Sequence, residues 1–405
     1  MQSRRRRGAW CGAAMLALTL ALGGVAAAPA PQGNVLLVDN ERTANPNLIA
    51  TALTIPANFS LAPHTLALPP GYSASVVAAG IAGPRFMAFD AEGNLLVAAQ
   101  EAGAVYRYPA GAGVIAPAPA PPPPLISGLN APSNVALFTV DGQDYLYVGE
   151  TNQVARYAYD ASGPVGSPDV IIPNLPTDGH LTRTVVFGPD GMLYLSVGSS
   201  CNICVEHDPL RATISRANPD GSGLSVIATG LRNAVGLAFE PGTDLLWATV
   251  NERDYQGDEI PPDLVTVITP GADYGWPICI PPNATPQEPG DDCSHITPPT
   301  IGIQAHSAPL GLTFVAGDRA PRDLAGDLIV AQHGSWNRQP PSPPKLLWIE
   351  FDNGAPIAAR DFAPGWQDAN GNRWGRPAGV IMAPDGSLIV SDDAAGMLYR
   401  IALSE

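Results

Sequence analysis

The sequence predicts an all-β fold, a six-bladed β-propeller with four-stranded antiparallel blades, on three observations. No long stretch keeps the apolar period of a helix, and short apolar or β-branched runs separated by turn residues recur along the chain. Residues 184–197 are typical, because two such runs flank the turn Gly188-Pro189-Asp190-Gly191. The hairpins recur at roughly 50 residues in the first half of the chain, a spacing that is typical of propeller blades.

Six segments each supply one candidate blade. They cover residues 72–108, 125–159, a third from about 170, a fourth from 224, a fifth from about 300 to 351, and 362–403. The matching anchor residues are Phe89, Phe138, Phe187, Phe239, Phe314 and Met382. Insertions at 277–299 and 338–344 explain the wider spacing of the later blades.

Residues 1–28 are expected to be an export signal. Four arginines at 4–7 precede an apolar run at 13–22 and the small residues 26–28, and the choice between the general and the twin-arginine route stays open. Residues 29–60 form an N-terminal arm whose strand-like piece, 51–55, could extend the last sheet, and residues 61–405 form the propeller. No later stretch is long and apolar enough to cross a bilayer, so a periplasmic or secreted protein is expected, not an integral membrane protein.

Charge and cysteine content narrow the function classes. Charged residues make up only 14% of the chain and the net charge is −16, which argues against a nucleic-acid partner. Beyond the signal, four cysteines remain, and proximity in an oxidising compartment predicts the disulfides Cys201–Cys204 and Cys279–Cys293. A redox-active or zinc-binding pair is the alternative. Val205 follows the first pair where haem attachment would need His.

Polar residues at equivalent strand ends are the candidates for function, since a propeller gathers such ends around one axis. His180 stands alone before the hairpin of the third blade and has no counterpart in the other blades. The other candidates are Asn130 and Glu150 in the second blade, Arg232, Asn233 and 251–254 in the fourth, 333–338 in the fifth, and Trp374 and Arg376 in the last. Cations in successive blades of an acidic protein suit a ligand with several carboxylates. Each one alone could equally bond a neighbouring loop.

Several motifs together resemble the soluble sugar dehydrogenases that use pyrroloquinoline quinone (PQQ), the glucose/sorbosone dehydrogenase family. They are GHLTRTVVFGPDGMLYLSVG, GLRNAVGLAF, NERDYQGDEIPPD with ADYGWP, AQHGSWNR, and GRPAGVIMAPDGSLIVSDDAAGMLYRI. The resemblance extends from about residue 72 to the last residues of the sequence. It implies the oxidation of a sugar, an aldose or a sorbosone-type aldehyde or hemiacetal.

The resemblance also implies roles for individual residues. His180 matches the general base that takes the hydroxyl proton while hydride passes to C5 of the quinone. Cofactor contacts fall on Arg232, Asn233 and Arg376, with His333 or Arg338 where glucose-oxidising members have Lys, and substrate contacts on Asn130 and Trp374. The backbone carbonyls of Glu252, Arg253 and Asp254 match the segment that holds Ca²⁺.

These roles agree with the chemistry of the residues. PQQ is a flat tricarboxylate that needs cations around it, and Ca²⁺ prefers oxygen ligands and can polarise a carbonyl. A downstream quinone, cytochrome or dye would accept the electrons. Two other functions stay open: a Ca²⁺-dependent lactonase, for which Glu150, Glu252 and Asn233 are the candidate ligands, and a non-catalytic ligand-binding propeller.

Overall fold

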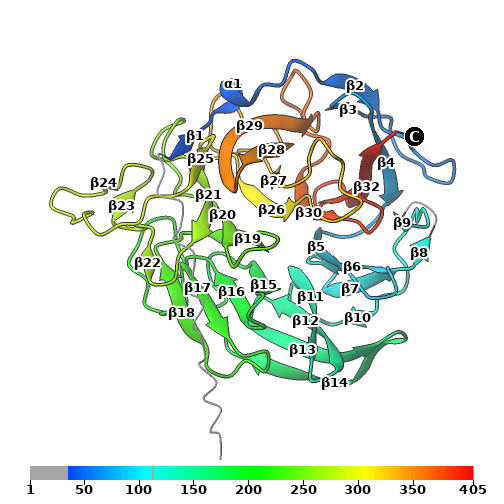
Figure 1. Cartoon of the computed structure of the whole chain (residues 1–405), viewed down its shortest axis with the longest axis horizontal. Coiled ribbons are helices and arrows are strands. Elements are labelled where there is room, and N and C mark those ends of the chain that lie inside the picture. Colours follow the sequence, from blue (N-terminus) through cyan, green and yellow to red (C-terminus); the bar gives the residue numbers. More distant parts are fainter. Residues whose placement is uncertain (1–34, 112–113, 405) are drawn as a thin grey trace, which may run out of the picture.

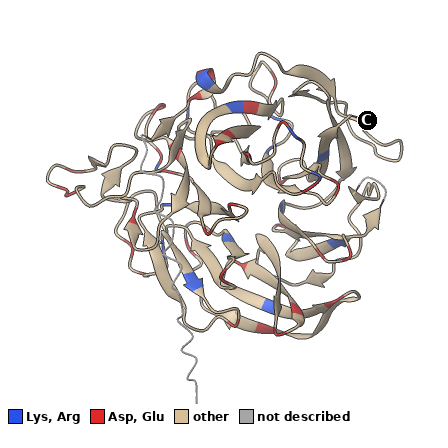
Figure 2. Cartoon of the chain, in the orientation of Figure 1, with Lys and Arg blue, Asp and Glu red and all other residues tan. Residues whose placement is uncertain are grey.

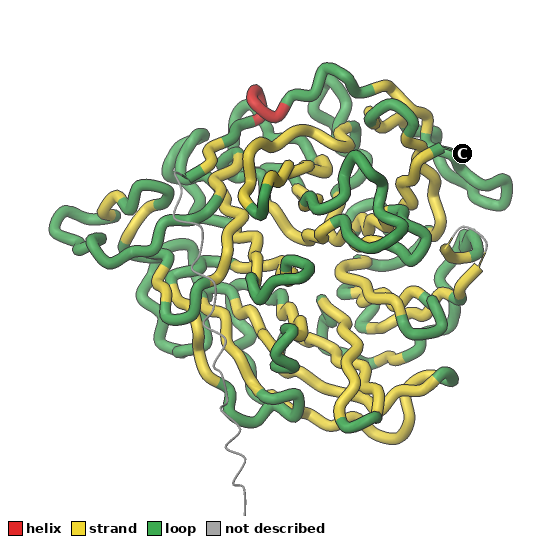
Figure 3. The backbone as a smooth tube through the Cα atoms, in the orientation of Figure 1, coloured by secondary structure: helices red, strands yellow, loops and turns green. Residues whose placement is uncertain are grey.

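Six β-sheets stand side by side as the blades of a ring in the computed structural model, which describes residues 35–111 and 114–404 (Figure 1). The predicted six-bladed propeller is therefore confirmed. Figure 3 shows that strands and loops make up nearly all of the ring, with one short helix, α1 (Asn40–Thr43), at its rim. The predicted export signal, residues 1–28, lies outside the described residues.

The first three blades follow one another along the chain. The first contains β5 (Pro84–Phe89), β6 (Leu95–Ala99), β7 (Ala104–Tyr108) and β10 (Ile126–Ser127). The second contains β11 (Asn134–Val140), β12 (Gln143–Glu150), β13 (Gln153–Asp160) and β14 (Gly163–Ile172). The third contains β15 (Arg183–Phe187), β16 (Leu193–Val197), β17 (Thr213–Ala217) and β18 (Ser225–Thr229), with β22 (Ala272–Asp273) added at its edge.

The other three blades complete the ring. The fourth contains β19 (Ala234–Phe239), β20 (Leu246–Val250), β21 (Asp263–Ile268) and β25 (Ile301–Ile303), with β1 (Leu36–Leu37) at its edge. The fifth contains β26 (Pro309–Phe314), β27 (Leu328–Gln332), β28 (Lys345–Asp352) and β29 (Ala355–Pro364). The last contains β30 (Pro377–Met382), β31 (Leu388–Asp392), β32 (Met397–Leu403) and β4 (Tyr72–Ala78).

Strand β4 corrects one boundary of the sequence analysis. Residues 72–78 were expected to open the first blade, but they pair antiparallel with β32 and form the outer strand of the last blade, with Ala74 opposite Ile401. The ring is thus closed by strands from the two ends of the described chain. Apolar residues of β4 and β32 pack into the same cluster as those of the fifth blade, and this burial favours the pairing.

The N-terminal arm contacts the fourth, fifth and last blades, and Lys345 of the fifth donates to Asn40 and Thr43, both at 3.0 Å. Strand β1 runs parallel to β25 of the fourth blade, while β2 (Ile49–Ala52) pairs with β3 (Thr65–Leu68). Thr54 exchanges backbone hydrogen bonds of 2.9 Å with Ala74 and Val76, at the edge of the last blade. Two further short strand pairs lie outside the blades: β8 (Ala110–Gly111) with β9 (Val114–Ile115), and β23 (Cys279–Ile280) with β24 (Thr285–Pro286).

The apolar core lies between neighbouring sheets. All six predicted anchors lie in the innermost strands, and Phe138 stacks on Phe187 of the next blade with 4.1 Å between ring centroids. Gly236 lets two innermost strands approach, because a Cβ there would lie 2.1 Å from the carbonyl oxygen of Leu310. Charged residues are few and spread around the ring (Figure 2). No helix among the described residues has the length and apolar character needed to cross a bilayer.

Candidate functional site

A polar cavity of about 250 Å³ lies where the loops of the third, fourth and fifth blades meet. Its loops precede an innermost strand or follow the second strand of a blade, so they lie at one end of the ring. The cavity is lined by His180, Arg232, Asn233, Asn251, Glu252, Asp254, Asp263, His306, Ala308, Trp336 and Asn337. Five of the predicted site residues are in this set: His180, Arg232, Asn233, Glu252 and Asp254.

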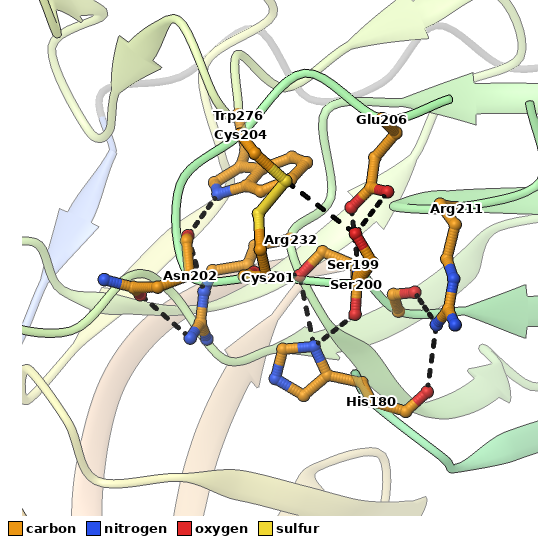
Figure 4. Close-up of a disulfide and its surroundings, with 11 residues drawn as sticks. His180, Ser199, Ser200, Cys201, Asn202, Cys204, Glu206, Arg211, Arg232 and Trp276 are labelled. Carbon is orange, nitrogen blue, oxygen red and sulfur yellow. Dashed lines mark hydrogen bonds between the residues drawn. A yellow bond between two sulfur atoms is a disulfide. The ribbon is translucent and has the colours of Figure 1, made fainter. Parts of the chain in front are cut away.

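The imidazole of His180 is held in one orientation. Its Nδ1 lies 2.9 Å from the carbonyl oxygen of Ser199 and 3.1 Å from the hydroxyl of the same residue (Figure 4). Because a carbonyl oxygen can only accept, Nδ1 carries the proton and Nε2 keeps a free lone pair. Two buried arginines fix the backbone: Arg183 and Arg211 donate to the carbonyl oxygen of His180 at 2.9 and 3.2 Å.

Burial lowers the pKa of His180 to about 4, and the charge of Arg232 acts in the same direction. Arg211 and Arg183 add to this shift, while the hydrogen bond from the imidazole to Ser199 opposes it. The imidazole is therefore neutral near pH 7, the form that can accept a proton.

We expect NMR titration of the apoprotein to place the midpoint of His180 near pH 4, with His180→Asn identifying the signal. An unfolded His titrates near 6.5, so the unfolded chain takes up this proton first as the pH falls. The contribution of this neutral imidazole to stability is thus complete above about pH 6.5 and is lost as the pH falls toward 4. A midpoint near 6.5 in the folded protein would contradict the buried, cation-flanked environment.

The guanidinium of Arg232 joins the fourth-blade loop to the cavity wall. It donates to the carbonyl oxygens of Asn251 and Glu252 at 3.2 and 2.7 Å and forms an ion pair of 2.9 Å with Asp254. The neighbouring Asn233 has a buried side-chain oxygen that accepts no hydrogen bond from the described residues. Arg232 and Asn233 are consecutive in the sequence, and both line the cavity, one with a cation and the other with an unpartnered oxygen.

Two acidic residues of the cavity are buried. Asp263 accepts backbone hydrogen bonds from Glu252 and Ala308 at 2.9 and 2.8 Å, and burial raises its pKa to about 7. One carboxylate oxygen of Glu252 accepts from Arg253 at 3.2 Å, while the other has no partner among the described residues. The side chain of Arg253 leads away from the cavity.

A second polar cluster lies at the same end of the ring. The imidazole of His333 contacts Asp393 at 2.7 Å, and Arg85 forms an ion pair with the other oxygen of that carboxylate at 2.7 Å. Burial alone would raise the pKa of Asp393, but its contacts with His333 and Arg85 hold it at about 2. Arg376 donates to the carbonyl oxygens of His333 and Gly334 at 2.9 and 2.8 Å. Arg85 also lies 3.5 Å from the hydroxyl of Thr182, so the cluster adjoins the His180 loop.

The structure brings three predicted site residues neither to the cavity nor to the second cluster, and Arg253 does not line the cavity either. Arg338 donates to the carbonyl oxygen of Asp258 at 3.1 Å and pairs with Glu259, so it fastens one loop to another. Asn130 is exposed, and its backbone donates to Glu150. Trp374 stacks on His64 with 4.0 Å between ring centroids and packs against the core of the last blade. Their predicted contacts with cofactor or substrate find no support in the geometry of the cavity.

Sequence reasoning missed four residues of this region: Arg85, Asp263, His306 and Asp393. Comparison of the blades did not mark Arg85, because it lies within β5, whereas Arg232 and Arg376 precede the first strands of their blades. Nε2 of His306 donates to the carbonyl oxygen of Gly257 at 2.8 Å, and no motif marked this residue. The two aspartates had no signal, since they lie within or just after strands whose burial only the fold reveals.

Both predicted disulfides are present, with Cα–Cα distances of 6.2 Å for Cys201–Cys204 and 5.9 Å for Cys279–Cys293. Glu206 lies near the first pair in an arrangement that could suit a metal. Because the two sulfurs are bonded to each other, they are not available as thiolate ligands. The first disulfide adjoins the cavity, and the second lies in the insertion that carries β23.

The fold is thus a six-bladed propeller with a polar cavity at one end of its ring, lined by one arginine, three acidic residues and two histidines among others. The chain belongs to the TrAA12-like family, whose model matches residues 66–260 and 271–404. This match includes every predicted residue of the site. The family consists of propellers related to PQQ-dependent sugar dehydrogenases.

Curated relatives and solved structures show similarity over much of the chain. A PQQ-dependent pyranose dehydrogenase of Coprinopsis cinerea is 30% identical over 55% of this chain and 39% of its own length. A PQQ-dependent sugar dehydrogenase of Hypocrea jecorina is 24% identical over 67% of this chain and 76% of its own length. The PQQ domain of the Coprinopsis cinerea enzyme, solved in its holo form, has a TM-score of 0.72 at 22% identity and covers 86% of this chain and 99% of that domain.

An uncharacterized protein of Borreliella burgdorferi is 29% identical over 57% of this chain. The chain spans 62% of that protein and 39% of the Coprinopsis cinerea dehydrogenase. The similarity to the latter thus concerns one part of a longer protein, and the structural match at this identity concerns the fold.

Proposed function

We propose that this chain oxidises a sugar, an aldose or a sorbosone-type aldehyde or hemiacetal, with PQQ and Ca²⁺, and that His180 is the general base. The observation that carries the proposal is the environment of His180. Its imidazole is neutral, its Nδ1 is fixed by Ser199, and it lies in the cavity that Arg232 lines. The dehydrogenase relatives support the same reaction class.

The cationic residues fit PQQ. A tricarboxylate needs donors that are not already neutralised, and Arg376 meets this condition because its two bonded nitrogens donate only to backbone carbonyls. Arg232 differs, because its N–H groups already donate to Asn202, to the carbonyl oxygens of Asn251 and Glu252, and to Asp254, so binding of a cofactor carboxylate exchanges one of these contacts. We infer that Arg232, Asn233, His333 and Arg376 hold the cofactor, whereas Arg85 is already paired with Asp393.

The oxygen atoms near Glu252 fit Ca²⁺. The unpartnered carboxylate oxygen of Glu252 and the side-chain oxygen of Asn233 are buried, and Ca²⁺ prefers such hard ligands. The carbonyl oxygen of Glu252 already accepts from Arg232, but an oxygen has two lone pairs and can serve both. We infer that the loop 252–254 contributes ligands through Glu252, whereas the side chain of Arg253 bonds to the carbonyl oxygens of Pro277 and Cys279.

In the proposed oxidation, His180 and Ser199 handle the proton of the substrate hydroxyl. His180 accepts the hydroxyl proton at Nε2, and the Ser199 carbonyl stabilises the imidazolium through Nδ1–H. When bound, PQQ supplies the carbon, C5, that takes the hydride and its two electrons from the sugar. The proton then leaves His180 readily, since the imidazolium is disfavoured by burial and by Arg232. A quinone, cytochrome or dye takes the electrons onward.

The decisive experiment is reconstitution. Purified apoprotein is mixed with PQQ and Ca²⁺, cofactor uptake is followed by absorbance, and dye reduction is measured with a panel of aldoses and with sorbosone. We expect stoichiometric uptake and turnover with at least one sugar, both abolished by a chelator before loading. Absence of PQQ uptake refutes the proposal, and hydrolysis of lactones without PQQ would assign the chain to the lactonase alternative.

No contact in the structure favours the lactonase. That reaction would need Glu150 to converge with Glu252 and Asn233. Glu150 instead accepts hydrogen bonds from the Asn130 backbone and the Gln153 side chain, both at 2.7 Å, and it does not line the cavity.

Two exposed aromatic rings at the cavity offer a surface for the sugar. Trp336 and Tyr255 are 64% and 74% exposed and meet edge to face with 5.6 Å between centroids. We predict that Trp336→Ala raises KM for the sugar about tenfold, a loss of about 1.4 kcal/mol, and leaves PQQ affinity unchanged. Steady-state kinetics on the loaded enzyme check this, with Trp348→Phe, on the outer part of the fifth blade, as the control. An unchanged KM would remove the ring from the substrate site.

A further inference from the structure

The disulfide Cys201–Cys204 closes a small ring that holds Asn202 against the cavity (Figure 4). The side-chain oxygen of Asn202 accepts from Arg232 at 3.0 Å and from the backbone N–H of Asp254 at 2.8 Å. Its side-chain nitrogen donates to the carbonyl oxygen of Asp254 at 3.0 Å. Its own carbonyl oxygen accepts from Arg232 at 3.2 Å and from Trp276 at 2.9 Å.

Asn202 thus connects three segments that are distant in sequence. It pairs with both backbone groups of Asp254 as a strand neighbour would, although this loop belongs to no sheet. It also directs the guanidinium of Arg232 toward Asp254, whose carboxylate lies 2.9 Å from Nη2. Both Arg232 and Asp254 line the cavity, whereas Asn202 does not.

The same ring contacts the other side of the site. The hydroxyl of Ser199 donates to the carbonyl oxygen of Cys201 at 2.7 Å, and this hydroxyl lies 3.1 Å from Nδ1 of His180. Ser200 is fixed by Glu206, which accepts from its backbone and its hydroxyl at 2.7 and 2.8 Å. The ring therefore touches the residues that orient His180 as well as those that orient Arg232.

We propose that Asn202 is a positioning residue for Arg232 and the loop 252–254, and that the Cys201–Cys204 ring holds it in place. The segment between β16 and β17 has no strand or helix of its own, so the covalent ring limits the conformations that Asn202 can adopt. The expected effect of Asn202 on PQQ binding rests on the proposed function, whereas its expected effect on the loop 252–254 does not.

The test compares four proteins: wild type, Asn202→Ala, the double variant C201S/C204S, and the control Asn218→Ala, which changes an exposed asparagine whose side chain bonds to Ser222. Hydrogen exchange of the apoprotein is followed by mass spectrometry in peptides covering 251–256. We expect faster exchange in Asn202→Ala and in C201S/C204S, because the N–H of Asp254 loses its acceptor, and wild-type exchange there in the control. Unchanged exchange in Asn202→Ala overturns the proposal, even if C201S/C204S fails to fold.

Cofactor titration provides the second measurement. Asn202→Ala should raise the Kd for PQQ by roughly tenfold or more, because Nη2 of Arg232 loses the side-chain acceptor that directs it, and kcat at saturating PQQ should stay within about threefold of wild type. A purely structural defect would instead lower the amount of active protein and leave Kd unchanged. If wild type does not bind PQQ, the proposed function fails, while the exchange measurement still decides the role of Asn202.

Discussion

Replacing His180 with Asn is expected to lower kcat by roughly 10²–10⁴-fold, the usual contribution of a positioned general base. Asn can keep a hydrogen bond to the Ser199 carbonyl but has no lone pair of comparable basicity at the position of Nε2. The Kd for PQQ should remain close to the wild-type value, since the guanidiniums are unchanged. Stopped-flow reduction of the loaded cofactor by sugar measures the step itself.

The matched control is Ser199→Ala, which removes one contact of Nδ1 and keeps the carbonyl contact of 2.9 Å. We expect that variant to lose far less activity than His180→Asn. Full turnover by His180→Asn would show that another group takes the proton.

Replacing Arg232 with Lys is expected to weaken PQQ binding by roughly 100-fold or more. A lysine keeps the charge, but it cannot reproduce the planar fork that contacts Asn202, Glu252 and Asp254 at once, and charge-assisted hydrogen bonds contribute about 1.5–3 kcal/mol each. Isothermal titration of the apoprotein with PQQ in the presence of Ca²⁺ measures the change.

Arg360→Lys is the control for that variant, because Arg360 lies on the exposed face of β29 and pairs with Glu350. Its affinity for PQQ should equal that of the wild type. Equal affinity in Arg232→Lys and Arg360→Lys would exclude Arg232 from the cofactor site.

The repeated hairpins made the propeller predictable from the sequence. The pairing of β4 with β32, which closes the ring, was not predictable. Each anchor, such as Phe187 or Phe314, lies in an innermost strand as its local pattern indicates. The assignment of β4 failed because its apolar run suits any sheet edge, and only the pairing of Ala74 with Ile401 decides which edge it joins. Local sequence carries no information on such a distant partner.

The candidate site was predictable where a motif marks the residue. His180, Arg232, Asn233, Glu252 and Asp254 meet at one cavity, and each lies within four residues of a strand end in a recognisable run. Arg338 was assigned to the cofactor as an alternative to His333 at the position where glucose-oxidising members have Lys, but both its guanidinium and the next backbone N–H donate to Asp258. Asn202 lay inside a cysteine pair that was considered only for its sulfurs.

The closure of the ring has a consequence for how the protein assembles. The hydroxyl of Ser73, next to the start of β4, donates to the carbonyl oxygen of Ala402 across 329 residues of chain. Strand β4 can pair with β32 only after nearly the whole chain has been synthesised. The ring of six blades therefore cannot close before then. A chain shortened before β32 would leave β4 as an unpaired, apolar edge, the kind of surface on which chains associate.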